Sequence, residues 1–195
     1  MSSSPIDMYL VRHGDARFMW GQDEDPSLSQ MGLDQARALA ARHTELAGCP
    51  ILTSPMRRAQ ETGQVLAEAW GSSRQMIEDL SEIPPPSGLD EQGRRDWIRQ
   101  AEAKTWTEMS ESYVSWRDGV VSWLRSRRSS FVAVTHTFFI NAALGDATSD
   151  PHVVIFWPEN CSLTHIRSGN DVFELVSRGD VGHSVLDDRA DPPSL

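Results

Sequence analysis

The sequence has little cysteine and no long hydrophobic run. Its 195 residues include two cysteines, too few for a disulfide framework, and neither has the close Cys/His spacing of a zinc site. We therefore expect both thiols, Cys49 and Cys161, to be buried. The longest apolar runs, such as Val153 to Trp157, have the length of a strand, whereas a membrane helix needs about 20 apolar residues. These absences argue against a disulfide-rich protein and against a membrane-spanning one.

Basic charge is also scarce. The chain has 18 Lys and Arg residues against 28 Asp and Glu residues, a net charge of −10. Phosphate backbones and anionic membrane surfaces repel such a chain, so we expect neither nucleic acid nor membrane as a partner. The Ser-rich start, residues 1–5, lacks the basic and then apolar order of a secretory signal. The sequence therefore predicts a cytoplasmic protein.

The length and composition predict one folded domain. A chain of 195 residues with 39% hydrophobic content can bury one sizeable core, but it is short for two ordinary domains. We expect this domain to span residues 1–180 and an acidic, flexible tail to occupy residues 181–195. Residues 84–110 begin with three prolines and do not fit the pattern of the rest. We expect them to form an insertion that covers the site, and we call them the lid segment.

Apolar runs alternate with helical patterns along the chain. Short buried strands are expected at residues 9–11, 51–54 and 131–135. Three- and four-residue spacing of apolar residues predicts helices at residues 31–46, with Ser29 as the N-cap, and at residues 56–70 and 113–124. A hairpin at residues 162–167 and 172–177 completes the sheet. This order predicts an α/β fold, a three-layer α/β/α sandwich around a mostly parallel central sheet.

Polar, chemically active residues follow the three predicted central strands. The first strand ends in Arg12 and His13, the second leads to Arg57 and Arg58 one helical turn later, and the third ends in His136. In an open parallel sheet such residues meet at the carboxyl ends of the strands. Guanidinium groups present paired N–H donors that match phosphate oxygens. The sequence therefore predicts a pocket for a phosphoryl group at this edge of the sheet.

The segment from Leu10 to Gly14 resembles the signature that opens the histidine phosphatases, the superfamily that includes the cofactor-dependent phosphoglycerate mutases. Further segments resemble the family in the family's own order, namely residues 29–36, 54–62, 80–82, 134–136 and 160–164. A single arginine–histidine–glycine triplet would be a weak signal, but several elements in order are specific. The resemblance covers Tyr9 to about Ile166 and implies a phosphoglycerate mutase-like fold.

The resemblance also implies roles for individual residues. His13 would attack phosphorus and become a phosphohistidine, since a neutral imidazole is a competent nucleophile near neutral pH. Arg12, Arg58 and His136 would stabilise the charge on the transferring group. Glu82 would protonate the leaving oxygen and then activate water, which requires a raised pKa. Neither a metal ion nor a cofactor is expected.

Further residues are expected to contact the substrate. Thr137 follows His136 where the family usually has glycine, and its backbone is expected to meet the phosphate. Trp97 and Trp106 belong to the lid segment and either line a substrate pocket or pack the lid. Two positions near His13 also depart from the family pattern, because Ala16 and Met19 replace polar residues that touch phosphate in many members.

These observations predict a metal-independent phosphatase that hydrolyses a small phosphomonoester through a phosphohistidine intermediate. Phosphatase is preferred over mutase because members of the mutase branch usually carry longer insertions. The alternatives are a phosphoglycerate-type mutase, a protein phosphohistidine phosphatase, and a member that binds a phosphorylated ligand without turnover. The expected partner is a small phosphorylated substrate, and a homodimer is possible.

Overall fold

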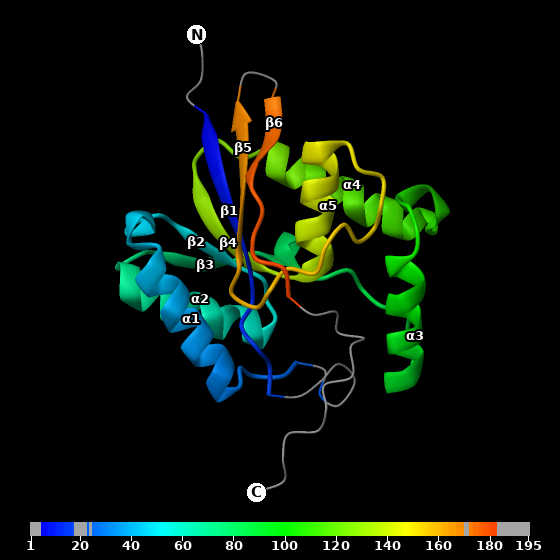
Figure 1. Ribbon diagram of the computed structural model, residues 1–195, viewed down its shortest axis with the longest axis horizontal. Coiled ribbons are helices and arrows are strands. Elements are labelled where there is room, and N and C mark those ends of the chain that lie inside the picture. Colours follow the sequence, from blue (N-terminus) through cyan, green and yellow to red (C-terminus); the bar gives the residue numbers. More distant parts are fainter. Residues whose placement is uncertain (1–4, 18–22, 24, 170–171, 183–195) are drawn as a thin grey trace, which may run out of the picture.

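The fold of the protein was obtained as a computed structural model that describes residues 5–17, 23, 25–169 and 172–182. The expectations for Met19 and for residues 183–195 of the tail lie outside these residues. Within the described chain, a six-stranded sheet runs through the centre in the order β3-β2-β4-β1-β5-β6 (Figure 1). The strands are β1 (Ile6–Arg12), β2 (Ile51–Thr53), β3 (Arg74–Met76), β4 (Phe131–Thr135), β5 (Leu163–Gly169) and β6 (Val172–Ser177).

The sheet is mostly parallel, as the sequence predicts. The strand β4 pairs in parallel with both β1 and β2, and β2 pairs in parallel with β3. In the described part of the chain, β5 pairs antiparallel with both β1 and β6, and its pairing with β6 forms the predicted hairpin. The carboxyl ends of β1, β2 and β4 therefore lie at one edge, and the predicted site residues follow them.

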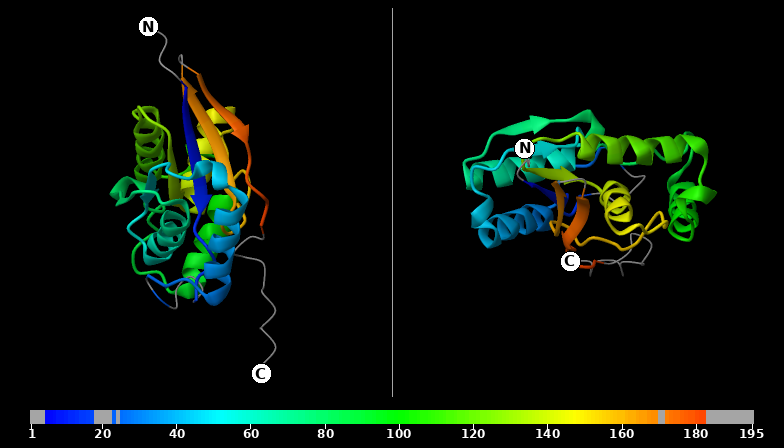
Figure 2. Two further views of the ribbon diagram at one scale, coloured as in Figure 1. Left: turned by 90° about the vertical axis from the view of Figure 1, so that its left-hand side faces the viewer. Right: turned by 90° about the horizontal axis from the view of Figure 1, so that it is seen from above.

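Helices cover both faces of this sheet (Figure 2). One layer contains α1 (Gln30–Arg42) and α2 (Arg57–Trp70), and the other contains α4 (Glu111–Arg125) and α5 (Thr137–Thr148). Alternating side chains of one strand enter different cores, as in β4, where Ala133 faces the α4/α5 layer and Val134 the α1/α2 layer. The predicted three-layer sandwich is therefore confirmed.

Local signals explain where the helices begin and end. Ser29 caps α1 as predicted, because its hydroxyl accepts a hydrogen bond from the Gly32 N–H at 3.0 Å. The helix ends at Arg42, earlier than predicted, and a short 3-10 turn, Thr44–Leu46, carries the chain on. The helix α2 ends at Gly71, which adopts the left-handed conformation that glycine tolerates best (φ 62°).

A helical pattern was expected after the third central strand, but the bounds of α5 were not predicted, and the short strand β3 was missed. The helix α5 is buried around most of its surface, with nine consecutive buried residues from Thr137 to Gly145. A helix that is buried on all sides has no alternation of apolar and polar faces for periodicity to detect. The helix nevertheless matters for the site, because it begins directly after His136.

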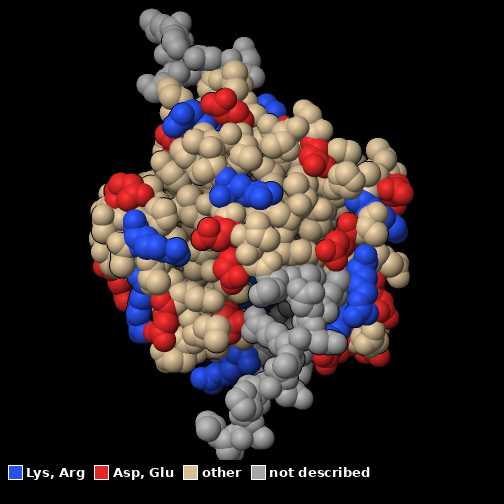
Figure 3. All heavy atoms as spheres, in the orientation of Figure 1, with Lys and Arg blue, Asp and Glu red and all other residues tan. Residues whose placement is uncertain are grey.

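The lid segment contains α3 (Glu91–Glu102) and a 3-10 turn, Trp106–Glu108. In Figure 1 the helix α3 lies to one side of the sandwich, and in Figure 3 basic side chains gather over it. The inner residues of the segment are nevertheless part of the main core, since Ile98 is 1% exposed and Trp106 is 4% exposed. The lid segment is therefore anchored by apolar packing.

The two cysteines differ in exposure. Cys161 is buried as expected, but the expectation for Cys49 was wrong, because this residue lies in the turn before β2 and is only partly buried.

At the start of the predicted tail, Val181 forms a bridge with Pro158. Among the described residues, no helix has the length and apolar character needed to cross a membrane.

Candidate active site

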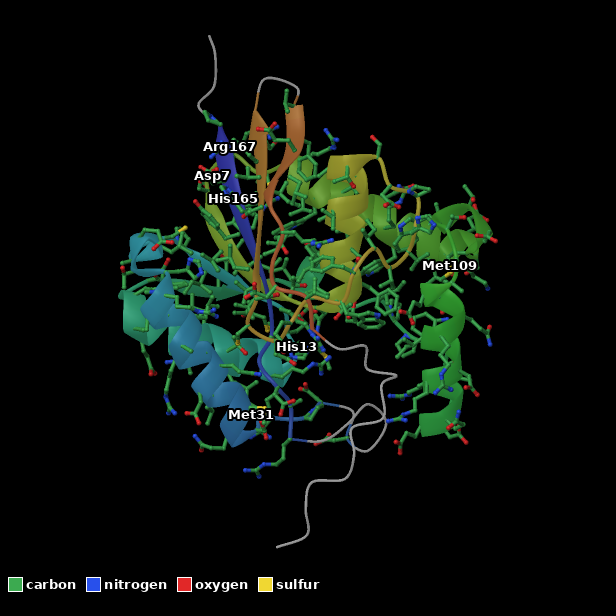
Figure 4. All side chains as sticks on the ribbon, in the orientation of Figure 1. Asp7, His13, Met31, Met109, His165 and Arg167 are labelled. Carbon is green, nitrogen blue, oxygen red and sulfur yellow. The ribbon has the colours of Figure 1, made fainter. Side chains whose placement is uncertain are left out.

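His13 lies at the carboxyl end of β1, at the lower end of the sheet in Figure 4. Its Nδ1 atom is 2.8 Å from the Gly14 carbonyl oxygen, which can only accept a hydrogen bond. The hydrogen-bond partners therefore assign the proton to Nδ1 and leave a lone pair on Nε2. Burial, together with the positive charges of Arg58 and Arg12, lowers the pKa of His13 well below its usual value. The imidazole is thus a neutral base with Nε2 available.

Arg58 joins this imidazole to the second histidine. Its Nε donates to His13 Nε2 at 3.1 Å, and its Nη2 lies 3.4 Å from His136 Nδ1. The two imidazole rings are 5.1 Å apart between centroids. Burial and the neighbouring guanidiniums also lower the pKa of His136 well below its usual value. The structure therefore brings together three of the predicted site residues, from β1, α2 and the end of β4.

Arg12 is the second buried arginine of the predicted site. Its Nη1 donates to the Pro158 carbonyl oxygen at 2.6 Å, and the side chain is 8% exposed. Its positive charge contributes to the lowered pKa values of His13 and His136, and it opposes the rise in the pKa of Glu82. Two buried guanidiniums beside two neutral imidazoles form a cationic site. Such a donor set is suited to an anion with several oxygens.

Glu82 is the only carboxylate among the predicted residues. It follows a 3-10 turn, Glu78–Leu80, and its carboxylate oxygens accept from the Phe138 backbone N–H at 3.2 and 3.4 Å. Burial raises its pKa to about 7, despite the opposing effects of these hydrogen bonds and of Arg58 and Arg12. Glu82 therefore holds a proton near neutral pH, as a general acid must.

The remaining predicted residues occupy different surroundings. Thr137 is buried at the first position of α5, where the positive end of the helix dipole favours anions. The Trp97 ring is 5.7 Å from the ring of Phe138, whose N–H holds Glu82. Trp106 instead packs in the core beside Trp116, with ring centroids 6.3 Å apart. The roles of these three residues in substrate binding remain predictions.

Three supporting side chains were not among the predicted site residues. Ser54 Oγ is 2.8 Å from His136 Nε2, the Thr62 hydroxyl accepts from the Gly14 N–H at 3.0 Å, and Asn160 donates to the His13 carbonyl at 2.8 Å. All three lie in motif segments quoted from the sequence, so their fixed places in the motifs were the available signal. The role of the Pro158 carbonyl could not be predicted in this way, because every residue type has a backbone carbonyl.

The fold and this group of residues define a class of protein: an α/β sandwich with a cationic, histidine-containing cluster at the carboxyl edge of its parallel strands. The sequence profile of the histidine phosphatase superfamily (branch 1) matches residues 8–181. The chain belongs to this superfamily.

Curated relatives match over a shorter stretch. The chain is 38% identical over 71 residues to a protein named probable phosphoglycerate mutase GpmB from Serratia proteamaculans (strain 568). That stretch covers 34% of this chain and 33% of the relative. A protein of the same name from Yersinia pestis (strain Pestoides F) is 35% identical over 71 residues, with the same coverage. The chain thus spans about a third of the length of these relatives.

Solved structures match over nearly the whole chain. A mycobacterial glucosyl-3-phosphoglycerate phosphatase in complex with VO3 has a TM-score of 0.68 at 22% identity, covering 92% of this chain and 99% of that one. A phosphoglycerate mutase from Bacillus anthracis str. Sterne has a TM-score of 0.74 at 16% identity, covering 91% and 94%. At these identities the similarity shows the fold, which is phosphoglycerate mutase-like.

Proposed function

We propose that the protein is a phosphatase that hydrolyses a small phosphomonoester through a phosphohistidine on His13. The observation that carries this proposal is the state of that imidazole: Nδ1–H is held by the Gly14 carbonyl, and Nε2 faces the cationic group around Arg58. A lone pair on nitrogen, surrounded by donors for phosphoryl oxygens, is the arrangement that nucleophilic attack on phosphorus requires.

The reaction would proceed in two steps. His13 Nε2 attacks phosphorus as the phosphorus–oxygen bond to the alcohol breaks, and Glu82 gives its proton to the leaving oxygen. Arg58, which donates to Nε2 without substrate, then donates to phosphoryl oxygens together with Arg12, and His136 would join them through Nδ1 once that atom carries a proton. In the second step Glu82 takes a proton from water, the water oxygen attacks phosphorus, and inorganic phosphate leaves His13. Atoms and protons balance over the cycle.

The similarity to proteins named as phosphatases and mutases supports phosphoryl chemistry and leaves two outcomes for the intermediate. We favour hydrolysis because members of the mutase branch usually carry longer insertions than this chain. A mutase would return the phosphoryl group to another hydroxyl of its substrate, and this outcome is separable by measuring free phosphate.

The test is turnover of p-nitrophenyl phosphate and a set of phosphorylated sugars and acids by the full chain. We expect release of inorganic phosphate, no effect of a chelator, and loss of activity by at least about 1,000-fold in His13→Ala. Rapid quenching under alkaline conditions should trap one phosphoryl group on His13.

His165→Gln is the matched control, because this histidine pairs with Tyr9 in the middle of β1, away from the carboxyl edge, and is bonded to Asp7 (Figure 4). It should keep activity. Phosphate transfer without release would indicate a mutase, and binding without turnover a ligand-binding member. Loss of activity with a chelator would contradict a metal-independent mechanism.

A further inference from the structure

One buried amide connects the turn at residues 155–158 to the helix α5. Asn141 is 0% exposed. Its Oδ1 accepts from the Ile155 and Phe156 N–H groups at 2.7 and 3.1 Å, and its Nδ2 donates to the Thr137 and Phe156 carbonyls at 2.8 and 3.0 Å. These four bonds use both donors and both acceptor sites of the amide. The turn is therefore held against the first turn of α5.

The two segments that Asn141 joins each support part of the site. The turn ends at Pro158, whose carbonyl accepts from Arg12 at 2.6 Å. The first turn of α5 follows His136 and supplies the N–H of Phe138 to Glu82. Within the described part of the chain, the Asn141 side chain makes no hydrogen bond to a predicted catalytic side chain. Its four bonds instead reach the backbone that carries or orients them.

A second bond holds the same turn from the lid segment. Trp157 Nε1 donates to Glu102 Oε1 at 2.8 Å, and the Trp157 side chain is largely buried. Glu102 is the last residue of α3. The turn is thus fixed from two directions, by α5 through Asn141 and by α3 through Glu102, and its Pro158 carbonyl lies between these bonds and Arg12.

We propose that Asn141 is a positioning residue of the phosphate site, acting through the Pro158 carbonyl on Arg12. A guanidinium on a long side chain needs a fixed acceptor to hold one direction, and a displacement of about 1 Å at a reacting group can cost about 100-fold in rate. Without Asn141, the N–H groups of Ile155 and Phe156 lose their acceptor, so the turn must move to satisfy them. The proposal rests on the proposed function, since it gives Arg12 a phosphoryl group to bind.

A double-mutant cycle between Asn141→Ala and Arg12→Ala tests this. In the native background we expect Asn141→Ala to lower kcat/KM for p-nitrophenyl phosphate by about tenfold and to weaken binding of inorganic phosphate by about fivefold. In the Arg12→Ala background the same change should have less than about a twofold effect, because its route to the site is gone. Activity should fall as pH rises through about 7, where Glu82 loses its proton, and this alkaline limb should not move in Asn141→Ala, because Glu82 keeps its own contacts.

Equal losses in both backgrounds would overturn the proposal and leave Asn141 a structural residue only. A shift of the alkaline limb would also overturn it, since the effect would then pass through Glu82. Thr148→Ala is the matched control: its hydroxyl bonds a carbonyl of the same helix, Leu144, at 2.8 Å and does not contact the turn. It should change neither kcat/KM nor phosphate binding.

Glu102 keeps the test decisive if Asn141→Ala does not fold. Glu102→Ala should produce an Arg12-dependent loss of about threefold, and Glu102→Gln should restore activity because its amide oxygen still accepts from Trp157. No loss in Glu102→Ala or in Trp157→Phe would then overturn the proposal. Phosphate binding by calorimetry separates the two hypotheses: if the native protein binds phosphate without turnover, the proposed function fails while the cycle still gives its answer.

Discussion

At the residue scale, Glu82 experiences two opposing influences. Backbone N–H groups and the nearby arginines favour its charged form, and burial favours its neutral form. Burial dominates, so the pKa rises to about 7. The two histidines beside it are affected in the other direction, since burial and positive charge keep them neutral. The pKa of the carboxyl group therefore lies above the pKa values of the two imidazoles, which is the reverse of the order of these pKa values in water.

This order of protonation predicts the pH dependence of activity. Activity requires Glu82 protonated and His13 neutral, so kcat/KM should be high on the acidic side of neutrality and fall as pH rises through about 7. Activity should persist well below pH 6.5, because the depressed pKa keeps His13 unprotonated there. A pH profile of kcat/KM measures both limbs, and Glu82→Gln should remove the alkaline limb. A rate that rises through pH 7 would contradict the assignment of Glu82 as the acid.

The same pKa predicts an effect on stability. Between pH 4.5 and about 7 the folded protein holds a proton on Glu82 that the unfolded chain releases, so Glu82 lowers the free energy of unfolding as pH rises through this range. Glu82→Gln should therefore raise that free energy by about 2 kcal/mol at pH 8 and have little effect at pH 4. Urea unfolding at the two pH values measures the difference. An equal effect at both would show that packing, rather than ionisation, is responsible.

At the element scale, the position of α1 depends on a glycine inside the helix. Glycine disfavours a helix by about 1 kcal/mol relative to alanine, yet α1 keeps Gly32 in its first turn. A Cβ atom there would lie 2.1 Å from the Asp15 carbonyl oxygen, and one at Gly14 would lie 2.7 Å from the Gly32 oxygen. The close approach of these backbones places the turn after His13 directly against α1.

We expect Gly32→Ala to lower the free energy of unfolding by about 2 kcal/mol or more, because the backbone must move apart to admit the methyl group. Phosphate binding should weaken as the turn after His13 shifts. Gly119→Ala in α4 is the matched control, since no atom lies within 4 Å of the added Cβ, and it should stabilise by up to about 1 kcal/mol. Thermal unfolding and phosphate titration measure both variants. If the two variants behaved alike, the contact with Asp15 would not matter.

At the scale of the whole molecule, one sheet serves two cores. The larger core lies against α4, α5 and the lid segment, and the smaller against α1 and α2. Both cores pack against the same strands, so one core cannot unfold without disrupting the sheet against which the other packs. On the face shown in Figure 3, acidic and basic side chains are mixed. The net charge of the chain is −10, whereas the buried site contains two guanidinium groups, of Arg12 and Arg58.

Sharing of the sheet predicts one cooperative unfolding transition. Cys161 belongs to the smaller core, and burial raises its pKa to about 12, so its thiol should react only on unfolding. In a Cys49→Ser variant, labelling of Cys161, far-UV circular dichroism and tryptophan fluorescence should report the same urea midpoint. Separate midpoints would show that the α1/α2 layer unfolds independently of the rest.

Patterns local in the sequence were enough to predict the three central parallel strands, the N-cap at Ser29 and the superfamily, because each depends on neighbouring residues or on a short motif. The motifs also contained the residues that meet at the carboxyl edge. The bounds of the helix α5 were not predicted because its burial removes periodicity, and the partial exposure of Cys49 depends on how the turn before β2 packs.

Folding in three dimensions decided the chemistry of these residues. The bonds from Arg58 to two histidines, the acceptor that Pro158 offers to Arg12 and the raised pKa of Glu82 join segments 45 to 146 residues apart. Distances and dehydration between such segments arise only when the whole chain packs. Residue identity therefore selected which groups could react, and tertiary structure set which of them hold a proton and what each one faces, because electrostatic and hydrogen-bond energies depend on burial and on distances that no local pattern contains.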